Sequence, residues 1–139
     1  NAHLSFDYNA GITNAKFETL EIAQNGNTNI LNGNKQIFTP DLVSNLALQY
    51  DQKLNKDLSG FVRTEWKYIG TTYFDLANSI QQNPYNIINA SLGLQMGDVQ
   101  IKYWTRNLTN QKYISYAYDF GAVHLGDPAT SGLSIAIKF

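Results

Sequence analysis

The sequence lacks several residue types on which common folds and sites depend. It contains no cysteine, which excludes disulfide bonds, thiolate metal sites and thiol catalysis. Charged residues make up only 15% of the chain, against roughly 25% in an average soluble domain. With a formal net charge of −1, the chain gives no electrostatic basis for a nucleic-acid partner. No apolar run reaches about 18 residues, so no transmembrane helix is predicted.

Motifs for phosphate binding, nucleophilic catalysis and zinc binding are also missing. The only histidines are His3 and His124, and His124 has only two carboxylates, Asp119 and Asp127, near it in the sequence. A zinc site needs more ligands than these. We therefore expect no metal site, no resident cofactor and no enzymatic activity.

The sequence is rich in segments where apolar and polar residues alternate with a period of two, which is typical of β-strands. The first segment spans twelve residues, which is long for a soluble strand but suits a tilted membrane strand of about 9–11 residues. We predict an all-β fold with six antiparallel strands. The alternating segments are residues 2–13, 41–51, 58–74, 85–96, 99–106 and 130–139.

The polar face of these strands is rich in Asn, Ser, Gln, Gly and Thr and carries few charges. A soluble antiparallel sheet usually presents many Lys, Glu and Asp to solvent. Arg63, Glu65 and Lys67 alternate on one face, and we expect salt-bridge partners there rather than a catalytic set. The composition favours a transmembrane barrel, with apolar side chains toward lipid and polar ones toward the lumen. A soluble sheet stays open as an alternative at this point.

The connections between the strands differ in length and follow a regular order. Turn-forming residues predict a long loop over 21–39, with room for a small hairpin, and a medium loop over 75–84. Short turns are predicted at 53–57 and 97–98, and a loop of about twenty residues follows Arg106. All long loops therefore fall at one end of an up-and-down sheet, as in outer-membrane barrels.

The C-terminal third carries a more specific signal. Residues 106–113 read R-N-L-T-N-Q-K-Y, residues 126–130 read G-D-P-A-T, and the sequence ends in Phe139. In this order and spacing, the three features resemble the C-terminal end of a TonB-dependent outer-membrane receptor. That family commonly closes with an R-N-L-x-[ND]-x-x-Y segment, an aromatic loop with a G-D-P-[RA]-T-like turn, and a last strand ending in Phe. A weaker match of the earlier strands extends the resemblance over most of the chain.

The resemblance implies that residues 1–139 form the C-terminal part of the receptor β-barrel, about six strands of a roughly 22-stranded barrel. The signal peptide, the plug domain and the segment that binds the TonB-type energy-coupling protein would then lie upstream. The implied function is energy-coupled uptake of a ferric siderophore or a similar scarce ligand across the bacterial outer membrane. Implied partners are the rest of the barrel, the plug, the energy-coupling protein, the barrel-assembly machinery and lipid. A passive porin-like channel and a soluble β-barrel that binds a small hydrophobic ligand are the alternatives.

Two groups of residues are candidate functional sites. Aromatic rings of the last long loop could stack on a flat ligand, or they could form an aromatic girdle at the membrane interface. These residues are Tyr113, Tyr116, Tyr118 and Phe120, whereas for Tyr73, Phe74 and Tyr85 we favour the girdle. The resemblance also implies that the last strand is the signal for barrel assembly, read by strand pairing. The signal residues are Leu133, Ile135, Ile137 and Phe139.

The alternation also predicts which side chains share a face of the sheet. We expect one set to point outward to lipid and the other into the lumen. The outward set is Leu46, Leu48, Leu92, Leu94, Ile101 and Ile135, and the inward set is Asn45, Arg63, Glu65, Ser91 and Lys102.

Overall fold

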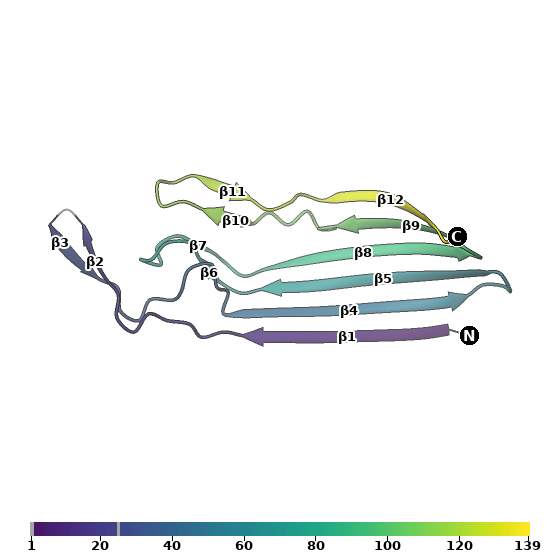
Figure 1. The fold of residues 1–139 in the computed structure, drawn as a ribbon, viewed down its shortest axis with the longest axis horizontal. Coiled ribbons are helices and arrows are strands. Elements are labelled where there is room, and N and C mark those ends of the chain that lie inside the picture. Colours follow the sequence, from purple (N-terminus) through teal and green to yellow (C-terminus); the bar gives the residue numbers. More distant parts are fainter. Residues whose placement is uncertain (1, 25) are drawn as a thin grey trace.

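The computed structural model describes residues 2–24 and 26–139, and this part of the chain contains strands and no helix. Six long strands form one antiparallel sheet in the order β1-β4-β5-β8-β9-β12 (Figure 1). Each strand pairs with the next along the chain, so the predicted all-β, up-and-down topology is confirmed. The long strands are β1 (Ala2–Ile12), β4 (Leu42–Lys53), β5 (Leu58–Ile69), β8 (Tyr85–Met96), β9 (Val99–Arg106) and β12 (Thr130–Ile137).

The connections divide between the two ends of the sheet as predicted. Both termini and the short turns, residues 54–57 and 97–98, lie at one end, and the three long loops lie at the other (Figure 1). We call residues 13–41, 70–84 and 107–129 the first, second and third long loops. Each contains a small two-stranded ribbon: β2 (Glu21–Gln24) with β3 (Asn27–Ile30), β6 (Thr72–Tyr73) with β7 (Gln81–Gln82), and β10 (Ile114–Ala117) with β11 (Val123–Leu125).

The strand register aligns side chains of one kind across the whole sheet. Residues that pair across the strands form lines over the sheet. Because alternate residues of a strand point to opposite faces, an apolar line on one face is followed by a largely polar line on the other. All eleven residues assigned to a face in the sequence lie on the predicted face. Contact of the apolar face with lipid stays a prediction. The apolar line is Leu4, Tyr50, Val62, Leu92, Tyr103 and Leu133, and the polar line is Ser5, Gln49, Arg63, Ser91, Trp104 and Gly132.

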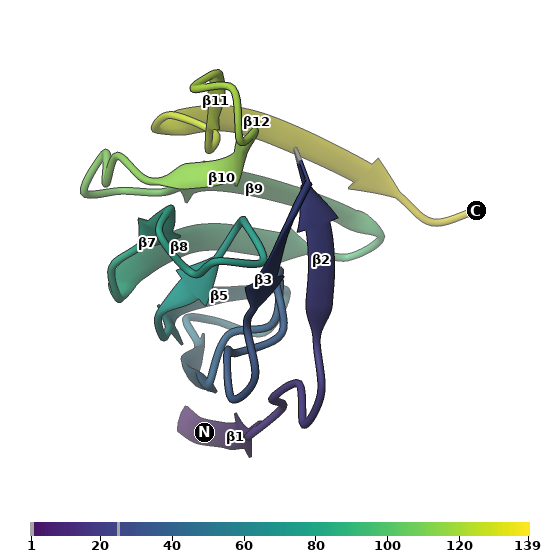
Figure 2. The same cartoon turned by 90° about the vertical axis from the view of Figure 1, so that its left-hand side faces the viewer.

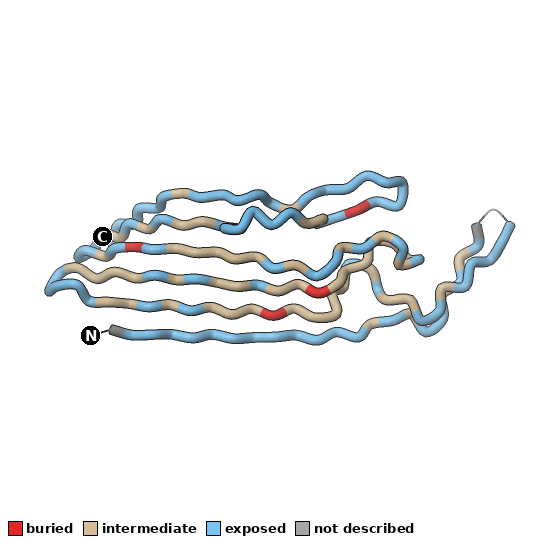
Figure 3. The backbone as a smooth tube through the Cα atoms, turned by 180° about the vertical axis from the view of Figure 1, so that it is seen from behind, coloured by how far each residue is buried: buried red, intermediate tan, exposed pale blue. Residues whose placement is uncertain are grey.

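The apolar face is not covered by any other described part of the chain. Side chains of the apolar line are between 45% and 72% exposed. Apart from glycines, the buried residues among those described are Ser44, Phe74, Asn107 and Ala117, which lie in the long loops or near the loop end of β4. Most of the tube in Figure 3 is coloured as exposed or intermediate. The described chain is therefore a single sheet without a closed hydrophobic interior. Within it, no helix is long and apolar enough to cross a membrane.

The polar face carries a hydrogen-bonded network and an open hollow of about 490 Å³. Arg63 Nε lies 2.8 Å from Glu65 Oε1, and Arg63 Nη1 donates to Gln49 Oε1 at 3.4 Å. This salt bridge was predicted; Lys67 shares the face but makes no salt bridge with another described residue. The Trp104 ring lies directly over Gly132 of β12, where a methyl group would collide with it. Such aromatic–glycine contacts between paired strands fix their register.

Several strand ends differ from the predicted ranges, and the largest difference is at the end of the third predicted strand. The third predicted strand was expected to continue to residue 74, but the corresponding β5 ends at Ile69. The next residue, Gly70, donates its N–H to the Leu42 carbonyl at 2.7 Å and lies so close to Asp41 and Leu42 that a side chain would collide with them. The last strand was expected to reach residue 139, but β12 ends at Ile137, so Phe139 lies beyond the last paired residue of the strand.

Candidate functional site

The first and second long loops are joined by hydrogen bonds from the side-chain amides of Asn34 and Asn78, which we call the clasp. Asn78 accepts a hydrogen bond from Lys35 N–H at 2.6 Å and donates one to the Lys35 carbonyl at 3.0 Å. Asn34 Nδ2 donates to the Leu76 carbonyl at 2.8 Å. Asn78 has a positive φ of 56°, a conformation that Asn adopts more readily than most residues. Because one amide satisfies both backbone groups of Lys35, the two loops are joined as a pair.

A second local motif shapes the turn after Phe74. Asp75 accepts hydrogen bonds from Ile80 N–H and from the Ser79 hydroxyl, each at 2.7 Å. Burial of Asp75 raises the pKa of its carboxyl, but these hydrogen bonds outweigh it and hold the pKa below its ordinary value. Asp75 therefore stays ionised at neutral pH and fixes the conformation of the turn.

Five aromatic rings from all three long loops form a continuous row, which we call the aromatic row. Ring centroids are 5.8 Å apart for Phe74–Phe38, 5.0 Å for Phe38–Tyr116, 4.6 Å for Tyr116–Tyr118 and 5.0 Å for Tyr118–Phe120. These spacings are those of favourable stacked and edge-on ring pairs. The row begins at Phe74, which is 6% exposed, and ends at Phe120, which is 76% exposed. It therefore leads from the packed base of the loops to solvent.

An open hollow of about 730 Å³ lies beside the aromatic row, and we call it the loop hollow. Figure 2 views this end of the molecule and shows the ribbons of the three loops in front of the sheet. A hollow with aromatic walls and a few polar groups is the usual form of a small-molecule site. The residues that line it are Ile22, Ala23, Asn29, Leu31, Ile37, Phe38, Phe74, Asp75, Leu76, Ala77, Tyr116, Ala117, Tyr118 and Asp119.

The four aromatic residues proposed from sequence as ligand-binding do not form one group. Tyr116 and Tyr118 line the loop hollow, and Phe120 extends the row beyond them. Tyr113 lies apart, stacked on Tyr85 with ring centroids 4.4 Å apart, and its ring covers Gly126. Tyr113 thus packs the base of the third long loop.

Sequence reasoning missed Phe38 and placed Phe74 in a membrane girdle. The structure corrects the second assignment, because Phe74 is buried among the loops rather than presented on the outer face. Phe38 sits in a polar loop with a positive φ of 56°, and no periodicity links it to the other rings. The ribbon of β10 and β11 was also expected to be irregular loop. Its strands have only four and three residues, too few to show alternation.

The R-N-L-T-N segment has a clear structural role. Asn107 is only 3% exposed, and its Nδ2 donates to the carbonyls of Gln111 and Asp127, each at 2.9 Å. Its Oδ1 accepts from Gln111 N–H at 2.8 Å, and its own N–H donates to Asn89 Oδ1 at 3.0 Å. The side-chain amide of Asn107 therefore joins both ends of the third long loop, and its backbone N–H ties this residue to β8.

We expect Asn107→Asp to lower the free energy of unfolding by about 1–3 kcal/mol, because a buried oxygen would replace an N–H group that faces two carbonyls. Asn110→Asp is the matched control, since Asn110 is exposed and its Oδ1 acts as an acceptor from Ala129 N–H, which Asp can reproduce. Thermal unfolding and limited proteolysis within residues 107–129 measure the effect. Equal unfolding temperatures for the two variants would show that the buried amide is unimportant.

The last strand places its apolar residues as the sequence predicted. Leu133, Ile135 and Ile137 pair with Tyr103, Ile101 and Val99 and share the exposed apolar face. Beyond the strand, Lys138 N–H donates to the Asp98 carbonyl at 3.0 Å, and the side chain of Phe139 is fully exposed. The structure thus presents the proposed assembly residues at an open edge of the sheet.

The two histidines do not belong to a metal-binding cluster. His124 Nδ1 lies 2.9 Å from the Ser115 hydroxyl within the β10–β11 ribbon, and His3 lies on the polar face of β1. In residues 2–24 and 26–139, no three His, Asp or Glu side chains are grouped so that they could hold a metal ion.

Comparisons with known proteins identify the fold. The sequence matches no protein-family model. The siderophore receptor PiuA from Acinetobacter baumannii aligns with 98% of this chain and 20% of its own length, with a TM-score of 0.82 and 18% identity. The ferric yersiniabactin uptake receptor FyuA from Yersinia pestis aligns with 98% of this chain and 21% of its own, with a TM-score of 0.79 and 21% identity.

A third solved structure gives the same result over a shorter region. BauA, the ferric preacinetobactin receptor from Acinetobacter baumannii, aligns with 78% of the chain and 16% of its own length, with a TM-score of 0.66 and 17% identity. The chain thus spans about one fifth of the length of the receptors that it matches. Its open six-stranded sheet and three long loops have the fold of a β-barrel segment of siderophore receptors.

Proposed function

We propose that this chain is the C-terminal part of the β-barrel of a TonB-dependent outer-membrane receptor that takes up a ferric siderophore or a similar scarce ligand. The fold that it shares with siderophore receptors supports this proposal, as do the three sequence features near the C-terminus. Iron is then part of the cargo of the proposed receptor.

The two faces of the sheet support a position in the outer membrane. An exposed apolar face on every long strand is costly in water but stable in lipid. The edge strands β1 and β12 each have one neighbour in the sheet, and their free backbone groups would cost several kcal/mol each inside a membrane. In the proposed receptor, the remaining strands of the barrel pair with these two edges, and the plug faces the polar side.

The loop hollow is the observation that carries the ligand-binding function. It lies at the end of the sheet opposite the short turns, which in outer-membrane barrels is the outer end. All three long loops contribute aromatic rings or aliphatic side chains to it, so a flat ligand group could stack there.

Energy-coupled import predicts that uptake stops when the proton gradient is collapsed, whereas conductance without coupling would indicate a passive channel.

Replacing Tyr116, Tyr118 and Phe120 together with Ala should weaken ligand binding by about tenfold or more, because each stacked ring contributes about 0.5–1.5 kcal/mol beyond the area it buries. The test measures ligand affinity and uptake of radiolabelled iron in cells that express the full-length receptor. The amount of folded receptor should be unchanged, because loop side chains do not take part in the strand ladder.

A double variant with Tyr116→Phe and Tyr118→Phe is the matched control, since it keeps both rings and removes only the hydroxyls. It should retain most of the affinity. Unchanged affinity in the triple Ala variant would instead assign these rings to loop packing or to the membrane interface.

A further inference from the structure

The loop hollow has an uneven charge distribution. Among the described residues that line it are two carboxylates, Asp75 and Asp119, and no lysine, arginine or histidine. The three long loops as a whole contain twice as many carboxylates as lysines. The carboxylates are Glu18, Glu21, Asp41, Asp75, Asp119 and Asp127, and the lysines are Lys16, Lys35 and Lys112.

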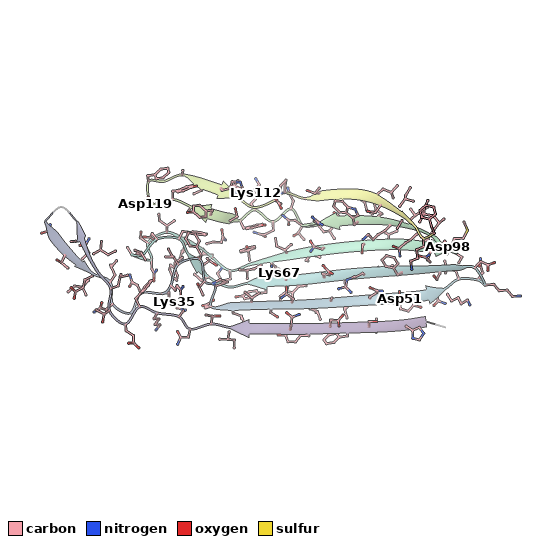
Figure 4. The ribbon with its side chains drawn as sticks, in the orientation of Figure 1. Lys35, Asp51, Lys67, Asp98, Lys112 and Asp119 are labelled. Carbon is pink, nitrogen blue, oxygen red and sulfur yellow. The ribbon has the colours of Figure 1, made fainter. Side chains whose placement is uncertain are left out.

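Two of the three loop lysines are placed where they do little to offset the charge of the hollow. Lys35 Nζ lies 3.5 Å from Asp41 Oδ2, so its charge is matched by a carboxylate outside the hollow. Lys112 precedes β10 at the base of the third-loop ribbon, whereas Asp119 lies at the turn between β10 and β11 (Figure 4). The lining of the hollow therefore includes Asp119 but neither of these amino groups.

The remaining walls of the hollow do not offset its two negative charges. The Phe38, Tyr116 and Tyr118 rings that line the hollow carry no net charge, so they do not neutralise the two carboxylates. Asp75 is held ionised by hydrogen bonds from Ile80 and Ser79. Among the described lining residues, the two carboxylates are thus the charges that act on a bound group.

We propose that the loop hollow selects its ligand by charge and takes an aromatic iron chelate that carries no net negative charge. This inference rests on the function proposed above and narrows it to a substrate class. An anionic chelate would enter a site with two carboxylates and no counter-charge among the described lining residues, whereas an uncharged one would gain the stacking without the repulsion.

Two ferric complexes of similar shape but different charge provide the test. A ferric tris-catecholate is anionic, and a ferric tris-hydroxypyridinonate is neutral, while both present three flat rings around the metal. Their affinities for the full-length receptor in detergent are measured by titration. We expect the neutral complex to bind about tenfold or more tightly than the anionic one at physiological ionic strength.

The variant Asp119→Asn tests whether the difference in affinity between the two complexes arises in the loop hollow. It should strengthen binding of the anionic complex by about threefold and leave the neutral complex unchanged. Asp57→Asn is the matched control, because it changes the net charge equally in a short turn at the opposite end of the sheet and should alter neither affinity.

Three results would overturn the inference. Tighter binding of the anionic complex would contradict charge selection and leave the proposed receptor function intact. Equal changes in the affinity for the anionic complex in Asp119→Asn and Asp57→Asn would show that the charge selection does not arise in the loop hollow. Binding of neither complex, together with normal uptake in the triple Ala variant, would remove the loop hollow as a ligand site and the charge selection with it.

Discussion

Replacing Phe139 by Ser should lower the amount of folded receptor in the outer membrane severalfold without changing the ligand affinity of the molecules that assemble. The position of Phe139 in the structure explains why the amount of folded receptor should fall while ligand affinity stays the same. Phe139 is fully exposed and lies beyond the last paired residue of β12, so its loss removes little packing from the folded sheet. A large deficit would then come from a contact outside the described sheet, and we propose that this contact is with the barrel-assembly machinery. Recognition would occur by strand pairing, with Leu133, Ile135 and Ile137 along the same face.

The measurement is the amount of heat-modifiable, correctly folded receptor in isolated outer membranes, compared with ligand affinity in the same samples. Phe139→Tyr is the conservative control and should assemble normally, because it keeps the aromatic ring. Lys138→Ser removes the neighbouring charge and tests whether any change near the end of the chain is harmful. Normal assembly of the Phe139→Ser variant would refute the assembly role.

Placing an arginine at position 48 should destabilise the receptor in lipid by about 2–4 kcal/mol, the cost of a cation near the middle of the bilayer. Leu48 lies in the middle of β4, paired with Phe6 and Thr64 on the apolar face. Its neighbour Ala47 lies on the opposite face between Asp7 and Glu65. Ala47→Arg introduces the same side chain beside two carboxylates and should cost little.

Both variants are compared by denaturant unfolding of the full-length receptor in lipid vesicles. The adjacent positions share a strand and a depth, so the difference between them measures the environment of the two faces. A similar loss of stability at both positions would mean that the face we assign to lipid meets water or protein.

The sheet could be predicted from the sequence because its order depends on a repeated local signal. Period-two alternation and turn residues located all six long strands, and tight turns such as 97–98 fixed their antiparallel order. The end of β5 escaped prediction, because alternation continues through Gly70 and only its contacts with Asp41 and Leu42 end the strand. Contacts of this kind join distant parts of the chain and leave no local pattern.

The candidate site was harder to predict from the sequence, because it too is formed by contacts between distant parts of the chain. Tyr116 and Tyr118 could be identified by their spacing within one loop, but Phe38 is brought to them from a loop almost eighty residues earlier. Asn78 appeared as one turn residue among many, although it holds two loops together. Tertiary hydrogen bonds and ring stacking decide which loop residues meet, and neither has a sequence period.

The clasp between Lys35 and Asn78 has a consequence for how such a receptor could change its specificity. Asn78 binds the backbone N–H and carbonyl of Lys35, which any residue except proline supplies, so the contact depends on the path of the first loop and on the asparagine in the second. Recombination that exchanges residues 13–84 together keeps the two loops matched, whereas a crossover between them keeps the contact only if the new first loop follows the same path. Specificity would then be inherited in pairs of loops.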